Sequence, residues 1–266
     1  MTKIGFIGVG NMGSALARAT SLADNSEVFL YDKDESRALS FAKEIGVNSS
    51  TLEYIAGECD YIFLAVKPNI IPLVIKEISP LLKSRDGYTV VSMAAGVSLS
   101  SMESAFGDTD APIIRIMPNT PAQIGKGMTL WCKNNLVTDS AASEFVRIMD
   151  KTGTLDAIPE RLIDAASAIS GCGPAFVYMF IEALADGGVE CGLPRDKALA
   201  YACETLIGAA ETVKQSGEHP EKLKDAVCSP GGSTIAGVHA LEGGAFRATS
   251  ANAVISAYKK TLTLGK

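Results

Sequence analysis

The sequence is poor in residues that hold metal ions. It contains two histidines and six cysteines, and no two cysteines form a C-x-x-C pair. The histidines, His219 and His239, do not stand at metal-ligand spacing from the cysteines, so we expect no metal site. No secretory signal precedes the first apolar run. This predicts a cytoplasmic protein whose cysteines are reduced and mostly buried.

An excess of positive charge and long apolar runs are also lacking. The formal net charge is −6, whereas non-specific nucleic-acid binding needs a basic surface, so we expect no nucleic-acid partner. The most apolar stretch of the C-terminal half, residues 175–181, is stopped by Glu182 and Asp186 and is too short to span a bilayer. We therefore expect no membrane partner. The 266 residues, 47% of them hydrophobic, suffice for one large or two ordinary domains.

A glycine-rich turn follows the first apolar run. The pattern Gly8-x-Gly10-x-x-Gly13 separates a predicted strand (residues 3–7) from a predicted helix (14–23). This is the context in which such a pattern binds a dinucleotide. The first glycine makes the tight turn, the second admits the pyrophosphate to the backbone, and the third lets the helix pack close to the strand. A turn of the same kind without a ligand is the alternative.

Asp32 ends the second predicted strand, residues 27–32. It stands about 20 residues after Gly13, near the position that accepts hydrogen bonds from the adenosine ribose of a dinucleotide. A carboxylate there repels the 2′-phosphate of NADPH, which favours NADH. Lys33 and Arg37 follow closely and would offset part of that repulsion. Both cofactors therefore stay open, with NADH preferred.

Apolar runs continue to alternate with predicted helices up to about residue 158. Further strands are predicted at residues 61–66, 88–93, 112–117 and 128–132. Continuous apolar strands joined by helices are typical of a doubly wound, mostly parallel sheet. We therefore expect an α/β protein with an N-terminal Rossmann-type domain at residues 1–158, whose ligand lies at the carboxyl ends of the strands.

Residues 159–266 are expected to form an all-helical domain. Helices are predicted at residues 162–170, 175–186, about 194–215, 221–227, 235–242 and 248–264. They are apolar over much of their circumference, and about a hundred residues cannot bury that much apolar surface alone. A partner subunit is therefore expected, with an intertwined homodimer as the smallest unit.

The stretch Ser229-Pro230-Gly231-Gly232-Ser233-Thr234 comes directly before the predicted helix at 235–242. Such a start leaves backbone N–H groups unpaired at the positive end of a helix dipole. It suits a small carboxylate, and glycine lets that anion approach the backbone closely. The plain structural alternative is a helix capped by Ser233 or Thr234.

Taken in order, the motifs of the chain resemble those of the pyrroline-5-carboxylate reductase family. They are residues 8–13, Leu64-Ala65-Val66-Lys67-Pro68, Ala94-Ala95-Gly96-Val97, Asn119-Thr120-Pro121, 170–175, 185–188, 223–225 and 229–235, with 241–242 and 244–247. The resemblance covers essentially the whole chain, and the motif at 229–235 is specific. It implies an oxidoreductase that uses NADH or NADPH to reduce the cyclic imine 1-pyrroline-5-carboxylate to L-proline, the last step of proline biosynthesis. It also implies a helical dimerisation domain after the Rossmann domain and, in many members, a larger ring of dimers.

The resemblance also assigns site residues. It implies that Gly231, Gly232, Ser233 and Thr234 bind the imino-acid substrate, with the amides of Ser233 and Thr234 on its carboxylate. The Thr234 hydroxyl, the implied catalytic group, would hydrogen-bond the ring nitrogen. The expected cofactor-binding residues are Gly8, Gly10, Asn11, Met12, Gly13, Asp32, Ala65, Val66, Lys67, Pro68, Ala95, Gly96, Asn119 and Pro121. Cys172 stands where the family commonly has serine, and Asp32 where many NADPH-using members have a hydroxyl or amide side chain.

Three other functions compete with this one. A β-hydroxyacid dehydrogenase needs a catalytic lysine in its helical half, and residues 171–186 contain none. A reductase of a six-membered cyclic imino acid is a closer alternative, because one extra methylene is worth only about 1–3 kcal/mol of discrimination in a pocket. A non-catalytic redox sensor that binds the dinucleotide has no need of the Gly231–Thr234 stretch.

Overall fold

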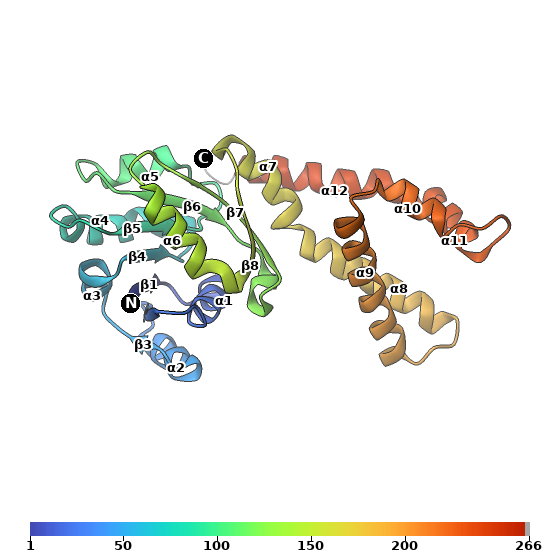
Figure 1. Ribbon diagram of the computed structural model, residues 1–266, viewed down its shortest axis with the longest axis horizontal. Helices are drawn as coiled ribbons and strands as arrows, with labels where there is room; N and C mark the ends of the chain where they lie inside the picture. The colour runs from blue at the N-terminus through green and yellow to red at the C-terminus, as the bar shows by residue number, and fades with distance from the viewer. Residues whose placement is uncertain (264–266) are drawn as a thin grey trace. The chain divides into compact units, whose positions relative to one another are not determined.

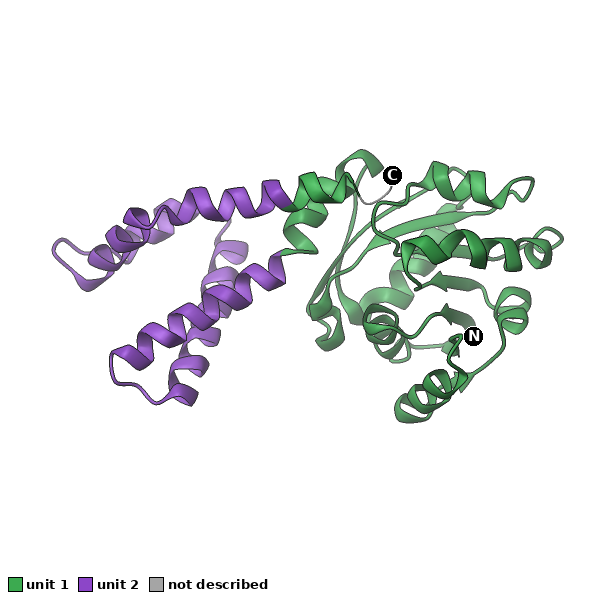
Figure 2. Cartoon of the chain, turned by 180° about the vertical axis from the view of Figure 1, so that it is seen from behind, with its two compact units in different colours: residues 1–172, 257–266 green, residues 173–256 purple. Residues whose placement is uncertain are grey.

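The computed structural model describes residues 1–263 and divides into two compact units (Figures 1 and 2). Unit 1 contains Met1–Cys172 together with the chain from Ala257 onward, and unit 2 contains Gly173–Ser256. The two units are the parts of the chain that are compact by themselves. The helix at Glu160–Ser170, the first of the predicted second domain, belongs to unit 1 together with the sheet. The predicted functional boundary between residues 158 and 159 stays a prediction.

Unit 1 is built on one eight-stranded sheet with the order β3-β2-β1-β4-β5-β6-β7-β8. The strands are β1 (Thr2–Ile7), β2 (Ser26–Tyr31), β3 (Asn48–Ser49), β4 (Tyr61–Leu64), β5 (Thr89–Ser92), β6 (Ile113–Met117), β7 (Gly127–Lys133) and β8 (Gly153–Ala157). Neighbouring strands are parallel except β6 and β7, which pair antiparallel. The predicted doubly wound α/β sheet is confirmed.

Helices cover both faces of the sheet (Figure 1). They are α1 (Asn11–Thr20), α2 (Glu35–Ile45), α3 (Leu52–Glu58), α4 (Ile71–Leu82), α5 (Leu99–Phe106), α6 (Asp139–Met149) and α7 (Glu160–Ser170), with 3₁₀ turns at Pro68–Ile70, Thr120–Ile124 and Asp150–Thr152. One apolar core joins the sheet to α3, α4 and α5, and a second joins it to α1, α2 and α6. Because both faces are buried, the central strands need apolar residues at every position, which explains their continuous apolar runs.

Strand β8 was not predicted from the sequence. Its residues Gly153–Ala157 are exposed or only half-buried, and they include Asp156. An edge strand of this kind has one neighbour and no continuous apolar run, so periodicity does not reveal it. It pairs in parallel with β7 and extends the sheet beyond the antiparallel strand.

A buried arginine ties α7 to the sheet. Arg115 of β6 is only 3% exposed, and its guanidinium donates to Glu160 at 3.0 Å and to Asp164 at 2.6 Å. The Glu160 carboxylate also accepts from the backbone N–H of Leu99, at 2.7 Å. A buried guanidinium needs such partners because removing one would leave an uncompensated charge. The pair of acids therefore fixes the start of α7 against β6 and α5.

Unit 2 consists of helices only, as predicted. They are α8 (Gly173–Glu190), α9 (Arg195–Ser216), α10 (Pro220–Ala226), α11 (Ser233–Gly243) and α12 (Phe246–Thr261), of which α12 belongs to this unit up to Ser256. The predicted end of α8 at Asp186 was wrong, because the helix continues through Gly187 and Gly188. A Cβ on Gly188 would lie 3.1 Å from the Ala198 Cβ. The glycine therefore serves close packing of α8 on α9 rather than a break.

Large apolar side chains on unit 2 are exposed in the single chain. Met179 is 70% and Ile207 is 53% exposed, and α10, α11 and α12 contain no buried residue in the part of the chain described. Together α7 and α8, Glu160–Glu190, are long and apolar enough by length and composition to cross a membrane, with only 11% of the apolar window buried. Apolar side chains are also exposed in this way, in a chain taken alone, when a second subunit covers them in a dimer.

The cysteines are less buried than predicted. All six are free; only Cys59 is buried, and Cys191 is exposed. Burial raises the pKa of the Cys59 thiol to about 12, which keeps it protonated and unreactive at neutral pH. Cys203 lies on α9, and Cys191 and Cys228 follow α8 and α10, all in unit 2, where the single chain leaves many side chains uncovered.

Candidate active site

The glycine turn packs tightly between β1, α1 and the end of β4. Gly8 has φ +105°, and a Cβ there would lie 2.7 Å from the Ala65 carbonyl oxygen. A Cβ on Gly13 would lie 2.4 Å from the Gly8 carbonyl oxygen. These distances are shorter than real Cβ contacts, so both positions require glycine. The predicted structural roles of the first and third glycines therefore follow from the packing.

Gly10 is different because the space beside it is open. A Cβ there would meet no atom within 4 Å. Gly10 is also the N-cap of α1, and no side chain among the described residues caps this helix. The N–H groups of the first turn, beginning at Asn11 and Met12, therefore face outward at the positive end of the helix. The turn fits the pyrophosphate of a dinucleotide.

A cleft of about 500 Å³ lies next to this turn, at the carboxyl ends of β1, β2 and β4. Six of the predicted cofactor-binding residues line it: Gly8, Gly10, Asp32, Ala65, Val66 and Lys67. Its position is the one at which open α/β sheets bind ligands.

Asn11, Met12 and Gly13 belong to the first turn of α1, and the other five predicted cofactor-binding residues follow neighbouring strands at the same edge. Pro68 begins the 3₁₀ turn after β4, and Ala95 and Gly96 follow β5. Asn119 and Pro121 follow β6. None of these lines the cleft described above, so their contact with a cofactor stays a prediction.

Asp32 has a structural role that the sequence did not reveal. One carboxylate oxygen accepts from the backbone N–H of Val9, inside the glycine turn, at 2.9 Å. The other accepts from the N–H of Asp34 at 3.0 Å. The side chain thus ties the end of β2 to the turn, beside the bond from the Gly8 N–H to the Tyr31 carbonyl at 2.7 Å. Its predicted contact with the ribose would use the remaining lone pairs.

Asn119 also holds protein groups. Its amide N–H₂ donates to the Ser170 carbonyl at 2.9 Å, and its amide oxygen accepts from the Met128 N–H at 2.8 Å. The residue is 8% exposed. Its side chain therefore fastens the end of α7 and the start of β7 to the end of β6. This contact joins segments distant in sequence, so no local pattern predicts it.

The start of α11 in unit 2 is uncapped. Gly231 has φ +71°, and Gly232 is the N-cap with no side-chain cap. The alternative in which Ser233 or Thr234 caps the helix was wrong, because both residues lie inside its first turn. Within residues 1–263, neither their backbone N–H groups nor their hydroxyls have an acceptor outside the helix. Four polar groups on two residues therefore remain open to a ligand.

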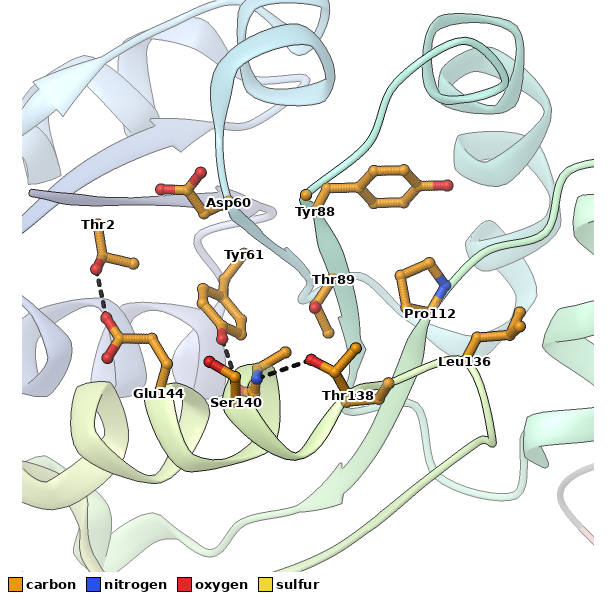
Figure 3. Close-up of a pocket in the computed structure, with 13 residues that line it drawn as sticks. Thr2, Asp60, Tyr61, Tyr88, Thr89, Pro112, Leu136, Thr138, Ser140 and Glu144 are labelled. Carbon is orange, nitrogen blue, oxygen red and sulfur yellow. Dashed lines mark hydrogen bonds between the residues drawn. The ribbon is translucent and has the colours of Figure 1, made fainter.

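A further pocket, of about 380 Å³, lies at the opposite edge of the sheet (Figure 3). Its polar side chains bond to protein groups: Tyr61 donates to the Ala141 carbonyl at 2.6 Å, Thr138 caps α6, and Thr2 donates to Glu144. The amino ends of the parallel strands meet here, away from the edge where such sheets bind ligands. We assign this pocket a structural role.

Glu144 gives this edge of the sheet a pH-dependent stability. Two bonds from Arg147, at 2.6 and 2.8 Å, hold the pKa of Glu144 at about 2, below the ordinary 4.5. A carboxylate with a lowered pKa stabilises the fold above about pH 4.5, and this contribution disappears as the pH falls towards about 2. The melting temperature of wild type should exceed that of Glu144→Gln at neutral pH. The difference should shrink between about pH 4.5 and 3; a constant difference would contradict the assignment.

Comparisons with known proteins cover the whole chain. The family model for pyrroline-5-carboxylate reductase dimerisation matches residues 160–264, and the model for coenzyme F420-dependent NADP oxidoreductases matches residues 3–96. Pyrroline-5-carboxylate reductase of Escherichia coli is 40% identical over 99% of this chain and 98% of its own length. The Arabidopsis thaliana enzyme of the same name is 37% identical over 99% of this chain and 96% of its own length.

Solved structures agree with these matches. The crystal structure of Plasmodium falciparum pyrroline carboxylate reductase with NADP bound superposes with a TM-score of 0.89 at 36% identity, and covers 100% of this chain and 98% of that one. The Streptococcus pyogenes 1-pyrroline-5-carboxylate reductase gives a TM-score of 0.88 at 33% identity, with 98% of both chains covered. A 3-hydroxyisobutyrate dehydrogenase from Mycobacterium tuberculosis shares the fold alone, at 11% identity and a TM-score of 0.53.

Proposed function

This chain belongs to the pyrroline-5-carboxylate reductase family, and from that premise we propose that it reduces 1-pyrroline-5-carboxylate to L-proline with NADH or NADPH. The reaction adds a hydride to C5 of the imine and a proton to its nitrogen, and completes proline biosynthesis. The observation that carries the proposal is the uncapped start of α11 at Ser233 and Thr234, a carboxylate site in a chain that also has an open dinucleotide turn.

The residues at the start of α11 have separate tasks. The backbone N–H groups of Ser233 and Thr234 bind the substrate carboxylate, aided by the helix dipole. The Thr234 hydroxyl hydrogen-bonds the ring nitrogen and thereby orients the ring, so that one face of C5 is open to the incoming hydride. The bound nicotinamide supplies the hydride. The protonated imine is already a good electrophile, so the chain needs no strong general acid there.

The histidines do not take part in this scheme. His219 caps α10, where its Nδ1 accepts from the Glu221 N–H at 3.3 Å. His239 lies more than a helical turn beyond Thr234 in α11 and is exposed. Thr234 therefore orients the nitrogen and relays a proton from water, for a modest gain in rate.

Asp32 should set the cofactor preference. We expect a lower KM for NADH than for NADPH, because the carboxylate repels a 2′-phosphate. Asp32→Asn keeps one acceptor and removes the charge, so it should move the ratio of kcat/KM values towards NADPH by about tenfold, or about 1.4 kcal/mol. Asp32→Ala should weaken both cofactors, because the Val9 N–H loses its acceptor. A wild-type KM much lower for NADPH would contradict the preference.

We further propose that the chain works as a homodimer in the cytoplasm, with residues 1–158 as the dinucleotide-binding domain and 159–266 as the dimerisation and substrate-binding domain. The match of residues 160–264 to the dimerisation model and the exposed apolar side chains of α8 and α9 support the dimer. Larger rings built from such dimers are part of the proposal. Sedimentation that found a stable, active monomer would contradict it.

The proposed activity is tested by adding 1-pyrroline-5-carboxylate to the protein with NADH and following the NADH absorbance. A fall that depends on both substrates and yields proline is the expected result. The six-membered cyclic imino acid, assayed in parallel, should give a lower kcat/KM. Equal or higher values for the larger ring would make that compound the substrate. No turnover of either, with dinucleotide binding intact, would favour a sensor.

A further inference from the structure

The substrate loop, residues 227–232, lies between α10 and α11, and a network of charged side chains joins these two helices to α12. Arg247, near the start of α12, bonds with Nη1 to Glu221 of α10 at 2.6 Å and with Nε to Glu242 of α11 at 2.5 Å. One guanidinium therefore connects the helix before the loop to the helix after it. Figure 1 shows α10 and α11 at one end of unit 2, with α12 leading away from them.

Further contacts hold Glu221 in place. Its second carboxylate oxygen accepts from Lys224 at 2.8 Å, and Lys224 also reaches Asp225 at 3.2 Å. The hydrogen bonds from Lys224 and Arg247 lower the pKa of Glu221 to about 2, so it remains a carboxylate at neutral pH. Glu221 therefore keeps its charged contacts with Lys224 and Arg247 under working conditions.

Apolar packing does little to place these helices within one chain. Neither α10 nor α11 nor α12 has a buried residue among residues 1–263. The loop itself contains Gly231 at positive φ, and a bond from the Gly232 N–H to the Ser229 carbonyl at 3.0 Å closes its turn. The backbone bond within the loop holds the turn. Arg247 holds together α10 and α11, the two helices that flank the loop. An isolated exposed ion pair contributes little to the free energy of folding, whereas a network in which several carboxylates share one arginine contributes more.

We propose that Arg247 is a positioning residue for the imino-acid carboxylate: by holding α10 and α11 together it sets the direction of the Ser233 and Thr234 amides. The inference rests on the proposed function, because it concerns the same carboxylate site. Arg247 need not touch the substrate. Its two bonds use a planar guanidinium with several donors, which a lysine ammonium cannot reproduce.

The test compares Arg247→Ala with Arg195→Ala as a matched control. Arg195 is an exposed arginine of the same unit that pairs with Asp186 across α8 and α9, away from the substrate loop in the sequence. Arg247→Ala should raise the KM for the imine and the Kd for L-proline, measured by calorimetry, by about tenfold. The KM for NADH and the melting temperature should change no more than in Arg195→Ala. Arg247→Lys should fall between wild type and Arg247→Ala.

A double-mutant cycle with Glu221→Gln shows whether Arg247 acts through α10. In the Arg247→Ala background this second change should have almost no effect on the imine KM, because the contact is already lost. An unchanged imine KM in Arg247→Ala would overturn the inference, as would equal effects of the two arginine variants. If Arg247→Ala fails to fold, Arg247→Lys and Glu221→Gln test the same contact, and an unchanged imine KM in both would overturn it. Wild type that does not reduce the imine would instead refute the proposed function.

Discussion

Gly10→Ala is expected to fold like wild type and to bind NADH about 100-fold more weakly. The added methyl group meets no protein atom within 4 Å, and φ at this residue is −70°, which alanine adopts freely. The methyl group would instead occupy the space through which the pyrophosphate approaches the backbone. Such a loss corresponds to about 2.7 kcal/mol of binding free energy. Calorimetric titration with NADH, beside a thermal melt, measures both effects.

Gly13→Ala is the matched control, and its main effect should be on folding. A Cβ at this position would lie 2.4 Å from the Gly8 carbonyl oxygen and 2.9 Å from the Ala65 Cβ. Overpacking of this kind costs about 1–3 kcal/mol of the free energy of unfolding, so the melting temperature should fall. If Gly10→Ala bound NADH as tightly as wild type, the turn would not be the dinucleotide site.

Thr234→Ala is expected to lower kcat/KM for the imine by about 10- to 100-fold, equivalent to about 1.4–2.8 kcal/mol. The Thr234 hydroxyl has no partner within the described residues, so its removal should not change the melting temperature. The backbone N–H remains, so the carboxylate is still bound and most of the loss should fall on kcat.

Ser233→Ala is the control for Thr234→Ala. It removes the neighbouring hydroxyl and likewise keeps the backbone N–H, and it should change kcat/KM only slightly. An unchanged kcat/KM in Thr234→Ala, or an equal loss in both variants, would refute the role of Thr234 at the ring nitrogen.

The sequence predicted most of unit 1 because its signals are local. The glycine turn required a strand before it and a helix after it, and the buried strands showed as continuous apolar runs. The half-exposed strand β8 had no such signal and was missed. In unit 2, a helix was predicted to end at residue 186, whereas α8 continues to Glu190 and Gly188 packs against Ala198 inside it.

The sequence proposed candidate site residues, but it did not reveal the contacts that hold them in place. Glycine and hydroxyl residues identified the start of α11, but which residue caps it depends on the backbone, and the N-cap is Gly232. Asp32 was expected near a ribose, and its bond to the Val9 N–H depends on how β2 and the turn pack. Arg247 and Glu221 lie on different helices, so their ion pair cannot be predicted from a local sequence pattern.

Transfer of deuterium from the cofactor tests the central claim most directly. Wild type is given 1-pyrroline-5-carboxylate with NADH deuterated at one or the other face of nicotinamide C4, and the proline is analysed by NMR. If the protein transfers a hydride from nicotinamide C4 to C5 of the imine, one of the two cofactors should place a single deuterium at C5 of proline. Proline without deuterium at C5 from both cofactors, or no proline at all, would contradict the account.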